Sequence, residues 1–216
     1  HIARKGVMEI NKEKTMPEKE IRAMPTTIEI RAAEDEDGKR TITGAIKYET
    51  DSADFVDWYG DTWIEQIAPG AFSESLKTRN VVGLWSHDTS QVLGNTKSGT
   101  LRIYDGEKEL RFELDIPNTQ SGNDAWELIQ RGDVDGVSFG MRVTKDKWST
   151  EQRGEKKIYK RTILNAELFE ISPVAFPAYP ANEVSARGLD EFKASEARVA
   201  DQYEKEKMIL ELDLYG

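Results

Sequence analysis

The chain has 216 residues and a mass of 24.5 kDa, enough to bury a hydrophobic core without help from disulfides or a metal. Forty acidic against thirty basic residues give a net charge of -10, which argues against nucleic acid as a partner, and no apolar run approaches the roughly 20 residues of a membrane helix. The absence of cysteine excludes disulfides, thiolate nucleophiles and zinc–thiolate sites, and because the other histidine is residue 1, imidazole chemistry falls on His87.

Residues 1–25 carry many charges and no sustained apolar pattern. We interpret them as a leader or flexible arm, part of which could dock as a strand or helix, and they lack the basic-then-apolar pattern of a secretory signal. From Thr26 the pattern becomes strand-like. Ile28 and Ile30 alternate with polar residues, an acidic turn follows at 34–38, and the alternation resumes over 41–48, which predicts a hairpin.

The middle of the chain reads mainly as strands with two short helices. Strands are predicted over 81–85, 99–103, 110–116, 137–148 and 158–174, with a polar loop over 150–157, and helices near Phe72–Leu76 and from Asn123 or Asp124 to Arg131. After Arg187, apolar residues recur every three to four positions among dense charges, which predicts an amphipathic helix over 188–216. This helix either packs on the sheet or protrudes as an interaction element or a cleavable tail.

The segment Gly136-Val137-Ser138-Phe139-Gly140 fits the pattern G-x-S-x-G, which in α/β-hydrolases marks a nucleophile between a strand and a helix. That context is wrong here, because a strand-like segment follows Ser138 and no histidine lies C-terminal to it. Ser138 is therefore either a small residue at the start of a strand or a nucleophile of another fold.

His87 lies at the end of the apolar run 81–85, where a buried strand would hold it while it faces a cleft. It is either a structural histidine or a base. Should Ser138 act as a nucleophile, it needs an imidazole within hydrogen-bond reach, because an unassisted hydroxyl reacts poorly near neutral pH. Within this chain that imidazole would be His87.

Acidic candidates for a third member are plentiful. In a regular strand, Glu170 would lie on the same face as Ala166, Leu168 and Ser172, which is largely inward, and Glu167 would lie on the other. An inward carboxylate requires a cationic or hydrogen-bonding partner. The alternative is a solvent-exposed glutamate on an edge strand. No histidine pair has the spacing of metal ligands, so we expect neither a metal nor a cofactor.

Several blocks of this sequence, in the same order, resemble the prohead protease family of tailed bacteriophages. They are Ile67-Ala68-Pro69-Gly70-Ala71-Phe72, Leu84-Trp85-Ser86-His87-Asp88, Leu93-Gly94, Ser98-Gly99-Thr100-Leu101, Arg131-Gly132-Asp133-Val134, Val137-Ser138-Phe139-Gly140-Met141, Leu168-Phe169-Glu170-Ile171-Ser172-Pro173-Val174 and Phe176-Pro177-Ala178-Tyr179-Pro180. The resemblance covers residues 26–187, the predicted protease domain. Asn95 departs from the family pattern, which usually has Arg after Leu-Gly.

The resemblance implies an α+β, mainly β fold similar to the herpesvirus assemblins, with a closed, mostly antiparallel β-barrel and surrounding helices. It implies a serine endopeptidase of capsid maturation in which Ser138 is the nucleophile, His87 the general base and Glu170 the orienting acid. Backbone amides near Gly140 or in the loop 178–182 are candidates for the oxyanion site.

The implied substrates are the major capsid protein or scaffolding protein, and the chain itself by autoproteolysis. The implied location is inside the prohead, in the cytoplasm of the bacterial host. A homodimer or larger homo-oligomer stays open, and we expect no nucleic-acid or membrane partner. The alternative from another class is a non-enzymatic capsid-assembly or scaffold protein with the same barrel.

Overall fold

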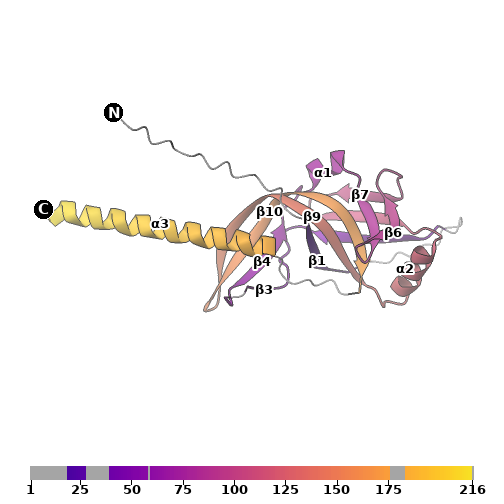
Figure 1. Ribbon diagram of the computed structural model, residues 1–216, viewed down its shortest axis with the longest axis horizontal. Helices are drawn as coiled ribbons and strands as arrows, with labels where there is room; N and C mark the ends of the chain where they lie inside the picture. Colours follow the sequence, from indigo (N-terminus) through magenta and orange to yellow (C-terminus); the bar gives the residue numbers. More distant parts are fainter. Residues whose placement is uncertain (1–18, 28–38, 58, 176–182, 216) are drawn as a thin grey trace, which may run out of the picture.

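A computed structural model of the chain describes residues 19–27, 39–57, 59–175 and 183–215. These residues form ten strands and three helices (Figure 1). The strands are β1 (Glu20–Thr27), β2 (Thr41–Lys47), β3 (Phe55–Val56), β4 (Thr62–Ile67), β5 (Val82–Trp85), β6 (Asp88–Asn95), β7 (Leu101–Asp105), β8 (Glu109–Asp115), β9 (Gly136–Arg153) and β10 (Lys156–Val174). The helices are α1 (Ser73–Thr78), α2 (Gln120–Gln130) and α3 (Glu183–Tyr215).

The strands form a large sheet in the order β1-β9-β10-β4-β3, with β5 also paired to β10 and β6 to β5, and a smaller sheet in the order β2-β8-β7. Most pairs are antiparallel, whereas β4 and β5 run parallel to β10. One hydrophobic core fills the space between the two sheets, for example Ile42 and Leu114 from the small sheet against Phe139 and Leu168 from the large one. The predicted mainly β, α+β class is confirmed.

The two sheets meet along both sides of this core. Strand β1 lies beside β2, and β6 lies beside β7 and β8. Among the described residues, no hydrogen-bonded ladder joins the two sheets. The closed barrel therefore stays a prediction.

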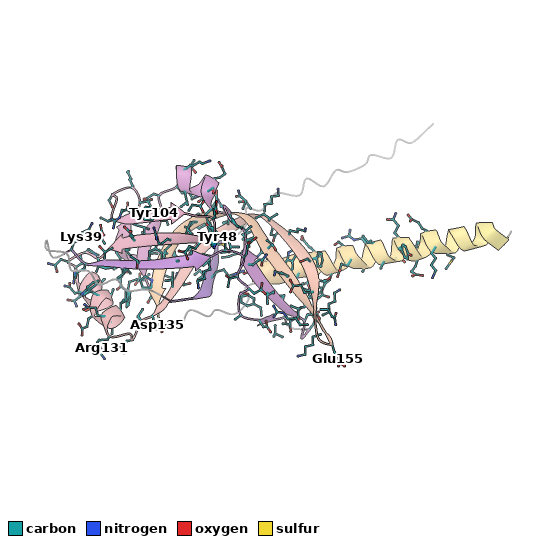
Figure 2. The ribbon with its side chains drawn as sticks, turned by 180° about the vertical axis from the view of Figure 1, so that it is seen from behind. Lys39, Tyr48, Tyr104, Arg131, Asp135 and Glu155 are labelled. Atoms are coloured by element: carbon teal, nitrogen blue, oxygen red, sulfur yellow. The ribbon has the colours of Figure 1, made fainter. Side chains whose placement is uncertain are left out.

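The hairpin of β9 and β10 is the spine of the large sheet. Both strands were expected, but the predicted polar loop over 150–157 is wrong. The ladder continues to the pair Arg153 and Lys156, and the chain reverses at Gly154 and Glu155. Polar side chains do not interrupt a backbone ladder, and the positive φ of 63° at Gly154 suits a two-residue turn. Glu155 marks the tip of the hairpin in Figure 2.

A β-bulge in β10 decides which side chains share a face. Leu168 pairs with Met141 and Glu170 pairs with Gly140, so Phe169 is an extra residue on β10. Leu168 and Met141 belong to the main core, and we call the opposite side of the large sheet the outer face. Because of the bulge, Glu170 does not share the face of Leu168, which corrects the expectation from a regular strand.

The two short helices lie close to their predicted positions. Helix α1 is confirmed near Phe72–Leu76. Helix α2 begins before the predicted start at Asn123 or Asp124, because Thr119 is its N-cap and the Thr119 side chain accepts a hydrogen bond of 3.2 Å from the backbone N–H of Gly122. Gly132, with a φ of 77°, follows its end as predicted.

Strand β1 includes the end of the predicted 1–25 arm and pairs antiparallel with β9. Strand β2 pairs with β8. Of the predicted hairpin of 26–30 with 41–48, the second strand is present as β2, and the pairing of the two segments stays a prediction. Ile28, Ile30 and the predicted turn at 34–38 lie outside the described residues, as do residues 1–18.

The long helix α3 combines both expectations for the C-terminal segment. Leu189 is fully buried and Phe192 packs with it against Trp63 and Tyr159. Farther along, α3 extends away from the strands, as Figure 1 shows, and Val199 is 69% exposed. Of the described helices, none combines the length and the apolar character that a membrane span needs.

Candidate active site

His87 lies in a strained turn between β5 and β6. Ser86 and His87 both have positive φ angles, 50° and 63°, which non-glycine residues rarely adopt. Such a conformation costs on the order of 1 kcal/mol per residue or more and persists only where the surroundings hold it. Here β10 holds it: the backbone N–H of Ser86 donates to the carbonyl of Pro173 at 3.3 Å, and the backbone N–H of His87 donates to Ser172 Oγ at 3.2 Å.

This turn brings the imidazole to the carboxylate of Glu170. His87 Nδ1 lies 2.8 Å from Glu170 Oε1, and Ser172 Oγ donates to Glu170 Oε2 at 2.7 Å. Glu170 is only 2% exposed, which confirms that this glutamate has the partners that its burial requires. The His87 ring, Glu170 and Ser172 therefore form one buried polar unit.

The charge state of Glu170 follows from these contacts. Burial alone would raise the pKa of its carboxyl group, but the hydrogen bonds from His87 and Ser172, together with the charges of His87 and Lys19, outweigh it. The pKa of Glu170 therefore lies below its ordinary value, and the group is a carboxylate near neutral pH. A carboxylate at Nδ1 favours the tautomer in which Nδ1 carries the proton and Nε2 faces away from it as an acceptor.

Gly140 makes room for this carboxylate. It pairs with Glu170 across the ladder, and a Cβ atom at position 140 would overlap with Glu170 Oε1 and with the end of the Lys19 side chain. Lys19 Nζ reaches across Gly140 to within 3.3 Å of Glu170 Oε1, the same oxygen that contacts His87. Gly140 lies within β9, inside the strand predicted over 137–148.

Ser138 lies on β9 directly opposite Ser172. Directly opposed residues point to the same face, with Cβ atoms about 4.5 to 5.5 Å apart. Since Ser172 contacts both His87 and Glu170, Ser138 shares the outer face with this unit. Its own hydroxyl is fully buried and donates to the carbonyl oxygen of Arg22 on β1 at 2.8 Å.

The structure thus joins two of the three predicted site residues directly, His87 and Glu170, and sets Ser138 beside them with its hydroxyl bonded to β1. Sequence reasoning missed Ser172 and Lys19. Ser172 could have been found, because it lies two positions after Glu170 and shares its face in any local strand. Nothing in the sequence around Lys19 links it to Glu170, which lies far along the chain.

No group of three or more potential metal ligands occurs among the residues that the structure describes. Of the candidate oxyanion donors, the loop 178–182 lies outside those residues, and Gly140 lies between β1 and β10 in the ladder. The chemistry that the described groups can perform is proton transfer through an imidazole held by a carboxylate, next to a serine hydroxyl.

An imidazole–carboxylate pair beside a serine is an arrangement typical of serine hydrolases, and here it lies in a mainly β fold. A family model, described as caudovirus prohead serine protease, matches residues 26–195 of the chain. The chain therefore belongs to the caudovirus prohead serine protease family. No curated protein matches it, and no solved structure does.

Proposed function

We propose that this serine peptidase of the phage prohead uses Ser138 as nucleophile, His87 as general base and Glu170 as the acid that orients the imidazole. The observation that carries the proposal is the contact of 2.8 Å between His87 Nδ1 and the buried carboxylate of Glu170, on the sheet face that Ser138 shares. A buried carboxylate that fixes the tautomer of the chain's single internal histidine fits a catalytic role better than a structural one.

In this mechanism the hydroxyl of Ser138 turns from the carbonyl of Arg22 to Nε2 of His87. The imidazole removes the hydroxyl proton as Oγ attacks a peptide carbonyl, and Glu170 stabilises the imidazolium without taking the proton. The imidazolium then protonates the leaving amine, and water releases the acyl group by the same steps in reverse order. Ser172 holds the second oxygen of Glu170 and the backbone of His87, so we assign it a positioning role.

The proposed substrates are segments of the major capsid protein or of a scaffolding protein, and the chain itself by autoproteolysis, inside the prohead in the host cytoplasm. The net charge of -10 fits protein partners better than the genome. The closed, assemblin-like barrel belongs to the same proposal, and the positions of β1 beside β2 and of β6 beside β8 support it.

The competing function is a capsid-assembly protein without turnover. The observation in its favour is the state of Ser138, whose hydroxyl is fully buried and bonded to the main chain. A nucleophile in that state cannot meet a substrate until something moves.

Co-expression with the capsid protein of the same phage separates the two functions. We expect the wild-type chain to shorten the capsid or scaffold protein, and Ser138→Ala to leave it intact. Ser195→Ala is the matched control, because Ser195 is exposed on α3. Intact capsid and scaffold proteins with the wild-type chain, in proheads that assemble normally, would favour the assembly protein.

A further inference from the structure

Strand β1 closes the site at the nucleophile. Ser138 Oγ donates to the carbonyl of Arg22 at 2.8 Å and is fully buried, whereas attack needs a substrate carbonyl carbon about 3 to 3.5 Å from Oγ. The position next to the hydroxyl is therefore taken by a peptide group of the chain itself.

The residue before β1 acts on the other end of the site. Lys19 Nζ lies 3.3 Å from Glu170 Oε1, the oxygen that also contacts His87. A cation there competes with an imidazolium for the same carboxylate, so this contact weakens the support that Glu170 gives to a charged His87. The segment 19–27 thus engages both the proposed nucleophile and the proposed acid.

The geometry of β1 is that of a bound extended peptide. Strand β9 pairs with β10 along one edge and with β1 along the other, in a register that sets Glu20 opposite Met141 and Ala23 opposite Ser138. Extended peptides bind to exposed sheet edges through the same backbone ladder. The ladder is irregular between Ala23 and Thr27, where Pro25 has no N–H to donate.

Strand β1 can leave the sheet without leaving an unpaired charge buried in the protein. Glu20 and Arg22 bond to each other at 2.6 Å, so the strand carries a neutral pair into the protein. Both also bond to residues on other strands of the same sheet, Arg22 to Glu65 on β4 and Glu20 to Arg161 on β10. When β1 departs, Arg161 keeps its bonds to Glu65 at 2.7 Å and to Asp146 at 2.6 Å, which avoids the large penalty of an isolated buried ion.

The extent of the family match agrees with a separable strand. The matched region begins at residue 26, so most of β1 precedes it. The matched region contains Ser138, His87 and Glu170 but only Thr26 and Thr27 of β1.

From these contacts we infer that the edge of β9 from Gly136 to Met141 receives an extended segment of the protein substrate, and that β1 is the chain's own occupant of this edge. The inference rests on the proposed function, since it takes Ser138 as the nucleophile. Strand β1 leaves the edge before the substrate binds, which frees the Ser138 hydroxyl and removes Lys19 from Glu170.

A reversible covalent lock tests this in the full-length chain, which has no cysteine of its own. Glu20 and Met141 are directly opposed in the ladder, and the distance between such residues suits a disulfide. Replacing Glu20 leaves two cations, Arg22 and Arg161, and two anions, Glu65 and Asp146, so the remaining cluster is neutral. In Glu20→Cys/Met141→Cys, the disulfide fixes the start of β1 to β9. The oxidised and reduced forms share the same two substitutions, so each is the other's control for folding.

The measurement is the rate at which a fluorophosphonate labels Ser138, with disulfide formation checked by intact mass. We expect the oxidised form to react at least about tenfold more slowly than the reduced form, because the open state is no longer populated. Equal rates in the two forms would overturn the inference and leave the proposed function standing. Failure of the wild-type chain and of both forms to label at Ser138 would remove the proposed function, and the inference with it.

Glu20→Gln is a second, independent variant. It removes the charge that holds β1 to Arg161 while Arg22 keeps its bond to Glu65. We expect faster labelling of Ser138 than in the wild-type chain, and faster hydrogen exchange at the β1–β9 amides with the rest of β9 and β10 unchanged. Slower or unchanged labelling together with faster exchange at β1 would overturn the inference.

Discussion

Two buried polar groups lie on opposite faces of the large sheet, on either side of the strands β9 and β10. On the outer face, His87, Glu170 and Ser172 form one unit beside Ser138. On the opposite side, Glu20, Arg22, Glu65 and Arg161 form a buried ion cluster, each of them 5% exposed or less. Both groups bury charge, and both involve the segment 19–27, yet their chemistry differs.

The ion cluster holds its charges fixed. Burial alone would raise the pKa of Glu65, but the neighbouring guanidinium groups of Arg22 and Arg161 outweigh it and lower that pKa. The pKa of Arg161 is raised further above its ordinary high value, because the charges of Glu65 and Glu20 outweigh its burial. These shifts keep Glu65 and Arg161 charged near neutral pH, and the cluster ties β1, β4 and β10 together.

The outer unit contains an imidazole and one hydroxyl group around one carboxylate, and the Ser138 hydroxyl lies on the same face. An imidazole gains and loses a proton in the range where enzymes work, and here it is held in a strained turn by the strand that carries the carboxylate. Burial of charge is therefore a poor marker of function in this molecule. The feature that nominates the outer unit as the proposed active site is an imidazole fixed beside a hydroxyl group.

Replacing a glutamate by glutamine in each group should separate an effect on catalysis from an effect on stability. The larger effect is expected at Glu170. In Glu170→Gln the imidazole loses the carboxylate that fixes its tautomer and stabilises its charge. We expect kcat for cleavage of a capsid-derived peptide to fall by a factor on the order of 10⁴. Retention of near-normal turnover in a folded Glu170→Gln chain would show that another acid orients His87.

In Glu65→Gln the guanidinium groups of Arg22 and Arg161 lose a buried partner. We expect the free energy of unfolding to fall by about 3 to 5 kcal/mol, as for other broken buried ion pairs, with no loss of kcat in the folded protein, because weaker anchoring of β1 favours the open site. Urea unfolding and peptide turnover of the same preparation measure both quantities. A large loss of kcat at full stability would make the two groups one functional unit and break the comparison.

Ser172→Ala should have an intermediate effect on catalysis. It removes one hydrogen bond to a carboxylate and one from the His87 backbone, contacts worth about 1.5 to 3 kcal/mol in charged cases, which corresponds to roughly a 10- to 100-fold loss of kcat. Because Ser172 acts through Glu170 and His87, the pH dependence of kcat should shift as well. A loss as complete as that of Ser138→Ala would identify Ser172 as the nucleophile.

The smallest expected effect is on the pH dependence of stability. Glu65 and Glu170 both have pKa values lowered from about 4.5 in the folded state, so the folded protein binds fewer protons than the unfolded chain in that range. Their contribution is complete above that ordinary value and is lost as pH falls through the lowered values. In urea unfolding between pH 7 and 3, Glu65→Gln and Glu170→Gln should each show a shallower acid limb, and parallel limbs would contradict these pKa shifts.

Local patterns predicted the regular parts of this fold. The alternating strands predicted at 99–103 and 110–116, and the end of α2 before Gly132, follow from periodicity and turn residues that lie close together in the sequence. The single internal histidine made His87 the candidate base by elimination, and the structure brings it to Glu170.

The errors arose where distant contacts decide the structure. The bulge at Phe169 moved Glu170 to the outer face, and no local signal marks it, because it depends on how β10 pairs with β9. Strand β1 came from a charged segment with little strand character, and the distant residues Glu65 and Arg161 supply ion-pair partners for its buried Glu20 and Arg22. Sequence alone could not show that this segment covers Ser138.

The central claim is that Ser138 is the nucleophile and His87 its base. Its most direct test is to label the purified chain with a fluorophosphonate and to locate the adduct by peptide mass spectrometry in the wild-type, Ser138→Ala, Ser172→Ala and His87→Gln proteins. We expect the adduct on Ser138, absent in Ser138→Ala, strongly reduced in His87→Gln and present in Ser172→Ala. An adduct on Ser172 or another serine, or labelling of Ser138 that does not depend on His87, would contradict it.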